Sequence, residues 1–269
     1  MPRLSPHSRF YLLTFVFSWT LWIGTALSGQ AFTEFPAVVL YTLGGFGPSV
    51  VGVWMIYREP DRASRRDLWQ RLTGVSRISG PWYAAIIVIF PLIFGVAYGI
   101  NALIGSAAPA MEGFAQVRLH PAALVGILIG GLVGGPLSEE LGWRGFAQDK
   151  VQARWPGWKA NLLLAAVWWA WHLPLFFIEG TTQARIGLGT AGFWLFLANI
   201  VPLTFIMAAT YNANRRSVLS AVLLHWLFNL TVTLVFPLPI VYNTIAVILC
   251  TVAASILYAR THSGSTESR

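Results

Sequence analysis

Long apolar stretches recur along almost the whole chain, and they constrain its fold more than any other feature. A helix needs about 20 mainly apolar residues to cross the hydrocarbon core of a bilayer. The stretches of that length lie at about residues 10–29, 36–57, 81–104, 121–140, 160–179, 190–211, 217–236 and 238–259. Only 10% of the residues are charged, whereas a soluble domain carries far more. We therefore expect an all-α, polytopic membrane protein, built as an eight-helix transmembrane bundle.

Nothing in the sequence divides these stretches into separate domains. No internal repeat, low-complexity tract or linker interrupts them, so residues 1-269 are expected to form a single transmembrane domain. The first stretch follows Arg3 and Arg9, as a signal peptide would, but it is long and has only a weak cleavage site behind it. We expect it to be retained as a span. Cys250 is the only cysteine, which excludes a disulfide within the chain.

The basic residues are distributed asymmetrically over the segments that join the spans. If the N-terminus lies inside and the spans alternate, the outside segments hold only Arg118 and Arg185 of the 18 basic residues. The inside segments hold Arg3, Arg9, Arg58, Arg62, Arg65, Arg66, Arg71, Arg77, Arg144, Lys150, Arg154, Lys159, Arg215, Arg216, Arg260 and Arg269. The positive-inside rule therefore predicts that both termini are cytoplasmic, in what we expect to be a bacterial plasma membrane. Anionic membrane lipids account for the net charge of +8, so no nucleic-acid partner is expected.

Two segments have patterns that predict how they pack. The segment after the second stretch is expected to form a short amphipathic helix on the inner surface, with Leu68, Trp69 and Leu72 facing lipid. In the fourth stretch, glycines recur every four residues from Gly126 to Gly134. Small residues on one helix face allow a neighbouring helix to approach closely, so this stretch is expected at the centre of the bundle.

A few ionisable or strongly polar side chains lie inside the predicted spans, where hydrocarbon penalises each of them by ~3 kcal/mol or more. They are Glu139, Glu140 and Arg144 in the fourth span, His172 in the fifth, and His225 and Asn229 in the seventh. Glu140 and Arg144 are four residues apart on one helix face and can form an ion pair. Glu139 points about 100° away round the helix and is free to face a central polar cavity.

Each of the two histidines has a polar or aromatic side chain four residues away on the same helix. His225 and Asn229 share a helix face, and Trp168 lies four residues before His172, where its indole can wall a pocket and orient the imidazole. A single histidine in a helix is more often a packing residue than a catalyst. Together, however, these groups can activate water and stabilise an oxyanion, or hold a divalent metal with an open position.

Three motifs at these positions resemble those of the CAAX prenyl protease and bacteriocin-processing family of intramembrane endopeptidases, also called the abortive-infection family. EExxxR is present at residues 139–144. FxxxH is present at residues 168–172, with Trp168 in the phenylalanine position, and HxxxN at residues 225–229. The resemblance covers about residues 121–236, and it is specific because the motifs follow in the family's order, each on a predicted span.

The resemblance implies a catalytic role for four residues. Glu139 would be the general base that activates a water molecule, assisted by His172. His225 and Asn229 would form the oxyanion site for the tetrahedral intermediate.

The resemblance also implies supporting roles. Glu140 and Arg144 would shape the site or engage the substrate, and Trp168 would keep the aromatic wall. Members of this family are commonly labelled metalloproteases, so a divalent metal such as zinc is one hypothesis, and a glutamate that acts without a metal is the other. The metal ligands would be Glu139, His172 and His225.

The function that this resemblance implies is hydrolysis of a peptide bond near the cytoplasmic membrane face. The substrate would be a peptide or a membrane-anchored protein, with prenylation as one form of anchor, and membrane lipids would surround the enzyme. The chain has no HExxH sequence and no aspartate inside a predicted span, which excludes two other classes of intramembrane protease. The alternatives are a small proton- or ion-coupled transporter, and a catalytically inactive membrane scaffold or immunity protein of the same fold.

The depth of these groups in the membrane decides whether they can meet. Counting ~1.5 Å per residue from the inner ends places His225 and His172 well inside the bilayer but leaves Glu139 near the inner surface. The three meet only if the fourth helix continues past its charged motif, with a bend near Pro136. Pro174 is expected to unwind the fifth span just after His172. We then expect one water-filled cavity that opens to the cytoplasm.

Overall fold

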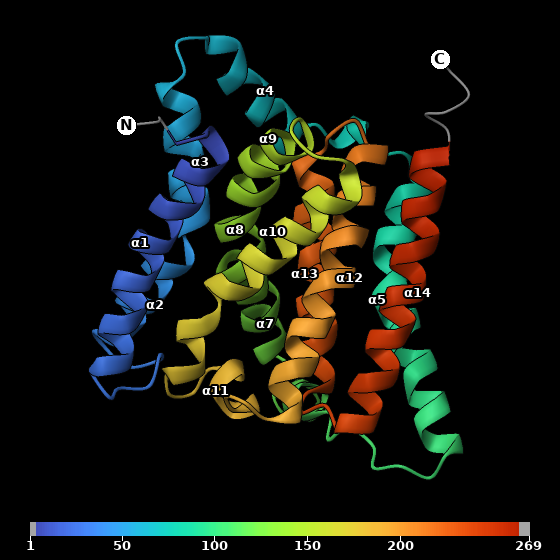
Figure 1. Cartoon of the computed structure of the whole chain (residues 1–269). Helices are drawn as coiled ribbons and strands as arrows, with labels where there is room; N and C mark the ends of the chain where they lie inside the picture. The colour runs from blue at the N-terminus through green and yellow to red at the C-terminus, as the bar shows by residue number, and fades with distance from the viewer. Residues whose placement is uncertain (1–3, 264–269) are drawn as a thin grey trace.

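The computed structural model describes residues 4–263, which fold into a bundle of helices without a strand among them (Figure 1). In chain order these are α1 (Pro6–Leu27), α2 (Ala37–Gly45), α3 (Gly47–Arg58), α4 (Arg62–Thr73), η1 (Val75–Arg77), α5 (Gly80–Leu103), α6 (Glu112–Leu119), α7 (Ala123–Leu132), η2 (Val133–Leu137), α8 (Ser138–Gly142), η3 (Trp143–Ala147), α9 (Gln148–Gln152), α10 (Gly157–Trp171), η4 (Leu173–Phe177), α11 (Thr182–Ile186), α12 (Ala191–Ala213), α13 (Val218–Val235) and α14 (Ile240–Ser263). The predicted all-α membrane fold is confirmed. Of the basic residues named above, Arg3 and Arg269 lie outside the described part of the chain.

The predicted spans are present, and one of them is broken in its middle. Within residues 4–263, 7 helices are long and apolar enough to cross a membrane, and the pair α2 and α3 brings the number to 8 if it counts as one span. The two halves of this pair meet at 49° around Phe46. Gly47 follows the bend and lies against α1, because a Cβ on it would fall 2.0 Å from Ser18 Oγ. Only a glycine allows this approach.

The fourth span follows one helical path of 30 residues from α7 to α9. Two π-helical segments, η2 and η3, flank the short α8. Pro136 lies in η2 and has no N–H to offer to the helix. Two carbonyls near it accept side-chain hydrogen bonds, Gly135 O from Ser138 Oγ at 2.9 Å and Leu137 O from Ser49 Oγ at 3.0 Å. The prediction that this helix continues past its charged motif is confirmed.

The fifth span changes its helical form at His172. The α-helix α10 ends at Trp171, and the 3₁₀-helix η4 begins at Leu173 with Pro174 in its first turn. The carbonyl of Trp171 accepts a hydrogen bond from Trp19 Nε1 of α1 at 3.1 Å. The predicted unwinding after His172 is therefore confirmed, and it places the imidazole where the two helical forms join.

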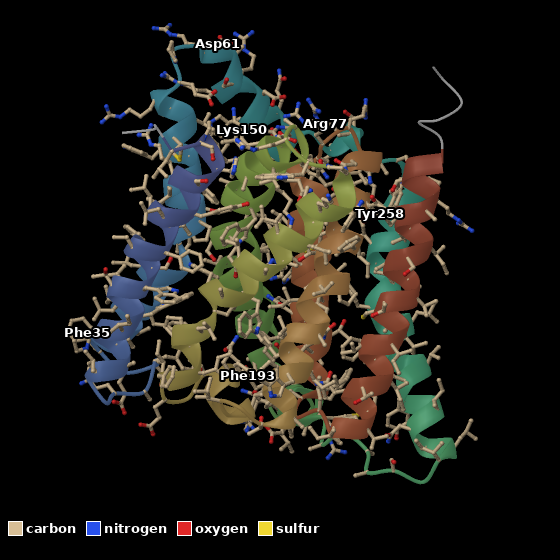
Figure 2. The ribbon with its side chains drawn as sticks, in the orientation of Figure 1. Phe35, Asp61, Arg77, Lys150, Phe193 and Tyr258 are labelled. Atoms are coloured by element: carbon tan, nitrogen blue, oxygen red, sulfur yellow. The ribbon has the colours of Figure 1, made fainter. Side chains whose placement is uncertain are left out.

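The two ends of the bundle differ in character. Both described chain ends lie at the end that carries α4, whereas α11 lies at the opposite end (Figure 1). Asp61, Arg77 and Lys150 gather at the α4 end, and Phe193 lies towards the other (Figure 2). We call the α4 end the basic end and the α11 end the far end. Between them α13 packs against α5, α12 and the η2–α8 part of the fourth span.

Helix α4 covers the basic end of the bundle and does not rest on lipid as expected. Leu68 is fully buried, and its Cδ1 lies so near Gly145 that a Cβ there would be 2.8 Å away. Leu72 packs against the cluster around Tyr211. Trp69 is 40% exposed. The expectation that Leu68 faces lipid is wrong, because the apolar side of α4 caps the bundle.

The glycine face of the fourth span does not pack closely on a neighbouring helix. A Cβ added to Gly126, Gly130 or Gly134 would meet nothing within 4 Å. Gly130 and Gly134 instead line an internal cavity. The packing expectation is therefore wrong for this face, where the absence of side chains leaves room inside the bundle.

Candidate active site

A cavity of about 910 Å³ lies inside the bundle. Its wall includes Glu139, Trp168, His172, His225 and Asn229. These side chains come from three spans that are distant in sequence, as the motifs predicted. Glu140 and Arg144 are fully buried and do not line the cavity. The tertiary structure therefore brings the predicted residues together, with the ion pair behind the cavity wall.

The carboxylate of Glu139 is held at one oxygen and free at the other. Trp168 Nε1 donates a hydrogen bond of 2.7 Å to Glu139 Oε2, and both side chains are buried. Glu139 Oε1 points towards the cavity beside Gly135. The four-residue spacing of Trp168 and His172 predicted a wall for the imidazole but not this hydrogen bond. The only available signal was the replacement of the family's phenylalanine by a side chain with an N–H.

His172 is oriented so that it offers a proton acceptor. Its Nδ1 lies 2.7 Å from the carbonyl oxygen of Trp168. Because a carbonyl can only accept, Nδ1 must carry the hydrogen, and Nε2 of the neutral ring is then the acceptor. The rings of Trp171 and Phe196 hold the imidazole from two sides, with centroids 4.9 and 5.5 Å away.

His225 is supported from behind by the buried ion pair. Its Nδ1 lies 2.8 Å from Glu140 Oε1, and Arg144 Nη1 donates to Glu140 Oε2 at 3.0 Å. The predicted pairing of Glu140 with Arg144 is present in the structure. The guanidinium also lies over the ring of Trp168, with Cζ 4.8 Å from its centroid. Glu140 therefore orients His225, much as a carboxylate orients the histidine of a hydrolase triad.

Three polar atoms from two spans converge beside Gly135. A Cβ on this glycine would lie 2.8 Å from Asn229 Nδ2, 3.7 Å from Glu139 Oε1 and 3.7 Å from His225 Nε2. A base, Glu139, and two potential hydrogen-bond donors therefore face the same point in the cavity. This arrangement can bind a water molecule or a carbonyl oxygen, and it needs a glycine at residue 135.

The residues proposed as metal ligands do not form a preorganised metal site. Within the described part of the chain, no group of three or more His, Cys, Asp or Glu side chains is arranged to hold a metal ion. The hydrogen bonds of Glu139, His172 and His225 leave Glu139 Oε1 and both Nε2 atoms unbonded, but these atoms are not grouped as three ligands around one point. In this arrangement the three side chains do not coordinate one metal ion together, and the catalytic steps below use only the protein's own side chains.

The cavity does not reach the end at which an opening was expected. Towards the far end its wall is built by Gly180, Arg185 and Thr190 around α11, and by Phe236 and Leu238. No residue of α4 or α9, which lie at the basic end, lines it. The cavity therefore does not extend to the basic end, and the expected opening to the cytoplasm stays a prediction.

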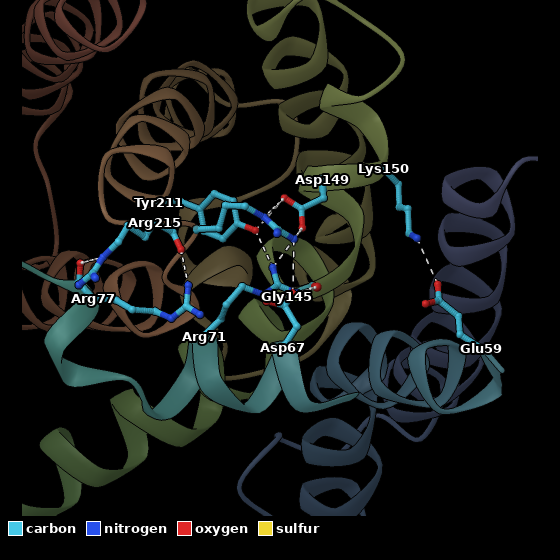
Figure 3. A network of polar contacts seen from close by, with 10 residues as sticks. Glu59, Asp67, Arg71, Arg77, Gly145, Asp149, Lys150, Tyr211 and Arg215 are labelled. Carbon is cyan, nitrogen blue, oxygen red and sulfur yellow. Dashed lines mark hydrogen bonds and ion pairs between the residues drawn. The ribbon is translucent and has the colours of Figure 1, made fainter. Parts of the chain in front are cut away.

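A second polar network lies at the basic end (Figure 3). The guanidinium of Arg71 is 4% exposed, and it bonds Asp67 at 2.9 Å, Asp149 at 3.1 Å and the Tyr211 hydroxyl at 2.7 Å. Arg216 also pairs with Asp149, and this hydrogen bond raises the pKa of Arg216 above its usual range. From the sequence, Arg71 and Arg216 indicated only the orientation of the chain in the membrane. The four-residue spacing of Asp67 and Arg71 was the available signal for a structural role.

Comparison with known proteins agrees with the three motifs. Residues 121–231 match the family described as Rce1-like, type II CAAX prenyl endopeptidase. The chain is 27% identical over 226 residues to the protein named CAAX prenyl protease 2 from Methanococcus maripaludis, and the match covers 82% of each chain. The resemblance drawn from the motifs is confirmed, and it supports an intramembrane endopeptidase.

Proposed function

We propose that this relative of the type II CAAX prenyl endopeptidases is an intramembrane endopeptidase that hydrolyses a peptide bond with water activated by Glu139. The observation that carries the proposal is the convergence of Glu139 Oε1, His225 Nε2 and Asn229 Nδ2 beside Gly135. Water is a poor nucleophile and the tetrahedral oxyanion is unstable, so a peptidase must supply a base and hydrogen-bond donors at one point. These side chains are of the required kinds.

Glu139 and His172 act on the water. The free oxygen of Glu139 takes a proton as the water attacks the substrate carbonyl, while Trp168 holds the other oxygen. The protonated Glu139 then gives its proton to the departing amine, so that the carboxylate is regenerated. His172 assists by accepting a hydrogen bond at Nε2, because its Nδ1 proton is held by the Trp168 carbonyl.

His225 and Asn229 stabilise the oxyanion. Asn229 donates from Nδ2. The Nδ1 proton of His225 is directed to Glu140, so His225 can donate from Nε2 only when the ring carries both protons. Glu140 holds the ring through Nδ1, and Arg144 holds Glu140 in place. Glu140 and Arg144 thus serve as positioning residues, since neither lines the cavity.

The membrane location, the orientation of the chain and the kind of substrate are part of the same proposal. The chain is an integral membrane protein, and we propose that both termini are cytoplasmic because the basic residues lie at their end of the bundle. The substrate is a peptide or a membrane-anchored protein, and prenylation is one anchor to be tested. The transporter alternative is less favoured, because buried side chains close the cavity towards the basic end, so that it does not run from one end of the bundle to the other.

The test is hydrolysis by the purified protein in detergent. The substrates are a prenylated CAAX peptide and a peptide library, each with and without a chelator. Glu139→Ala should abolish cleavage, whereas Asn229→Ala should retain activity lowered by about 10²–10³-fold, the usual loss for one oxyanion donor.

Glu179→Ala is the matched control. Glu179 follows the fifth span, is exposed, and does not line the cavity, so its removal should leave cleavage unchanged. Cleavage by Glu139→Ala at the wild-type rate would remove the mechanism. If the wild type cleaves no substrate, but Glu139→Ala alters proton uptake into liposomes, the proton-coupled transporter would replace the peptidase as the function.

A further inference from the structure

Two asparagine side chains in the cavity wall have no hydrogen-bond partner. The Oδ1 atoms of Asn199 and Asn243 are buried, and neither side-chain amide forms a hydrogen bond with any of the described residues. Both side chains line the cavity, and Asn199 is only 9% exposed. Burying a polar group without a partner is unfavourable, so we expect an occupant of the cavity to supply the missing bonds.

Buried asparagines outside the cavity wall do have partners in the protein. Asn101 donates from Nδ2 to the carbonyls of Ser106 and Ala107 at 3.2 and 3.0 Å. Asn214 donates in the same way to the carbonyl of Thr210 at 2.8 Å. Each of these two asparagines is 1% exposed, and neither lines the cavity. The fold thus provides for these amides but not for those that face the cavity.

Asn199 lies close to the catalytic residues. Phe196, Asn199, Ile200 and Leu203 have the spacing of one face of α12, and all four line the cavity. The ring centroid of Phe196 is 5.5 Å from that of His172. Asn199 follows Phe196 by three residues, which is about 4.5 Å along the helix axis. Among these four side chains only that of Asn199 is polar, so α12 presents one amide in an otherwise apolar face.

An amide side chain is complementary to a peptide group. Its oxygen accepts from an N–H, and its nitrogen donates to a carbonyl. An extended polypeptide has both backbone groups unpaired, whereas a helix has already used them, and a hydrocarbon chain has neither.

We propose that Asn199, with Asn243 as a second contact, binds the backbone of the substrate polypeptide near the scissile bond and holds it in an extended form. This inference rests on the proposed function and adds binding residues to the same site. The apolar residues around Asn199 would contact the side chains of the substrate, and the amide would fix the position of its backbone.

Asn199→Leu tests this role, because leucine has nearly the same shape as asparagine but no polar group. We expect KM for a cleaved peptide to rise about 3- to 10-fold with kcat unchanged, since the lost bond contributes equally to the ground state and the transition state. The melting temperature should not fall, because the change removes an unpaired buried amide. Asn243→Leu should raise KM less, since Asn243 is only half-buried.

Asn212→Leu is the matched control. Asn212 lies on the same helix but is exposed and does not line the cavity, so its replacement should change neither KM nor kcat. If Asn199→Leu does not fold, Asn199→Ala takes its place. A lower melting temperature with an unchanged KM would show that Asn199 serves only packing, and the proposal would be overturned.

Substrates with a single backbone ester identify the bonded peptide group. Each ester removes one N–H from the cleaved peptide, at every position except the scissile bond. At one position the ester should raise KM of the wild type but not raise KM of Asn199→Leu any further, because the two changes remove the same bond. If every ester affects both enzymes equally, water satisfies the amide and the proposal fails.

A binding measurement separates this inference from the proposed function. The probe is a fluorescent peptide selected from a library by its binding to purified Glu139→Ala. Adding Asn199→Leu to this variant should raise Kd about 3- to 10-fold, whereas adding Asn212→Leu should not. An unchanged Kd would overturn the inference even if the wild type cleaves peptides. If no peptide is cleaved but Kd rises as expected, the proposed hydrolysis fails and the backbone site stands. A library without any binding peptide would overturn both.

Discussion

Trp168 takes the position at which the family motif has phenylalanine, and its indole N–H reaches Glu139 at 2.7 Å. A phenylalanine would fill much of the same space but could donate nothing. The same residue accepts from His172 through its carbonyl and lies beneath the Arg144 guanidinium. One residue therefore contacts Glu139, His172 and Arg144, through its indole and its backbone carbonyl.

We expect Trp168→Phe to lower kcat by about 10- to 100-fold, because a hydrogen bond to a charged group contributes about 1.5–3 kcal/mol. KM should be unchanged, since the bond is to the catalytic carboxylate and not to the substrate. Trp169→Phe is the control, because the indole N–H of Trp169 has no partner in the described structure. Equal losses in kcat for the two variants would show that aromatic volume, and not the N–H, is what matters.

Gly135 is required by the atoms that face it. Gly135→Ala would place a Cβ 2.8 Å from Asn229 Nδ2, so the amide must move away from the oxyanion position. We expect kcat to fall about 10²–10³-fold, as on losing one such donor, with little change in melting temperature. Gly134→Ala is the control, since its Cβ would meet nothing within 4 Å although Gly134 also lines the cavity. Comparable activity of the two variants would contradict the assigned geometry.

At the scale of elements, α4 is the clearest case of a helix whose role depends on its partners. Its charged composition and few apolar residues are typical of a helix on a membrane surface. In the structure Leu68 is buried and Arg71 is almost completely so. The pattern identified an amphipathic helix correctly but not the surface against which it packs.

We expect Arg71→Ala to reduce the free energy of unfolding by about 1–3 kcal/mol, because several buried hydrogen-bonding groups lose their partner. The measurement is the melting temperature of the purified protein in detergent. Arg66→Ala, on the exposed side of the same helix, should leave it almost unchanged. The docking of α4 would be in doubt if both variants melted together with the wild type.

Some of the breaks in the helices are predicted by the local sequence, and others are not. Pro136 and Pro174 predict the irregular segments η2 and η4, because proline lacks the N–H that an α-helix needs. The bend at Phe46 was not predicted, although Pro48 in the first turn of α3 also lacks the N–H that would continue the helix. It occurs where Gly47 lets α1 approach, which is a contact between segments distant in sequence.

At the scale of the whole molecule, the donors that could hold a metal are distributed over three spans, and within the described residues no three of them are arranged to hold an ion. We therefore expect cleavage by the purified protein to persist after treatment with a chelator. A zinc protease acting on the same peptide library serves as the positive control. Loss of activity that added zinc restores would favour the metal hypothesis.

The sequence by itself determined the membrane spans, the end of the bundle that is basic, and the residues that meet at the site. These depend on local quantities: hydrophobic length, charge in the connecting segments, and costly polar groups such as His225 inside apolar helices. Only the tertiary structure decided that Trp168 binds Glu139, that Glu140 supports His225 from behind, and that the cavity leads away from the basic end. Each of these depends on which side chains from distant helices fill a given space, and no local pattern contains that information.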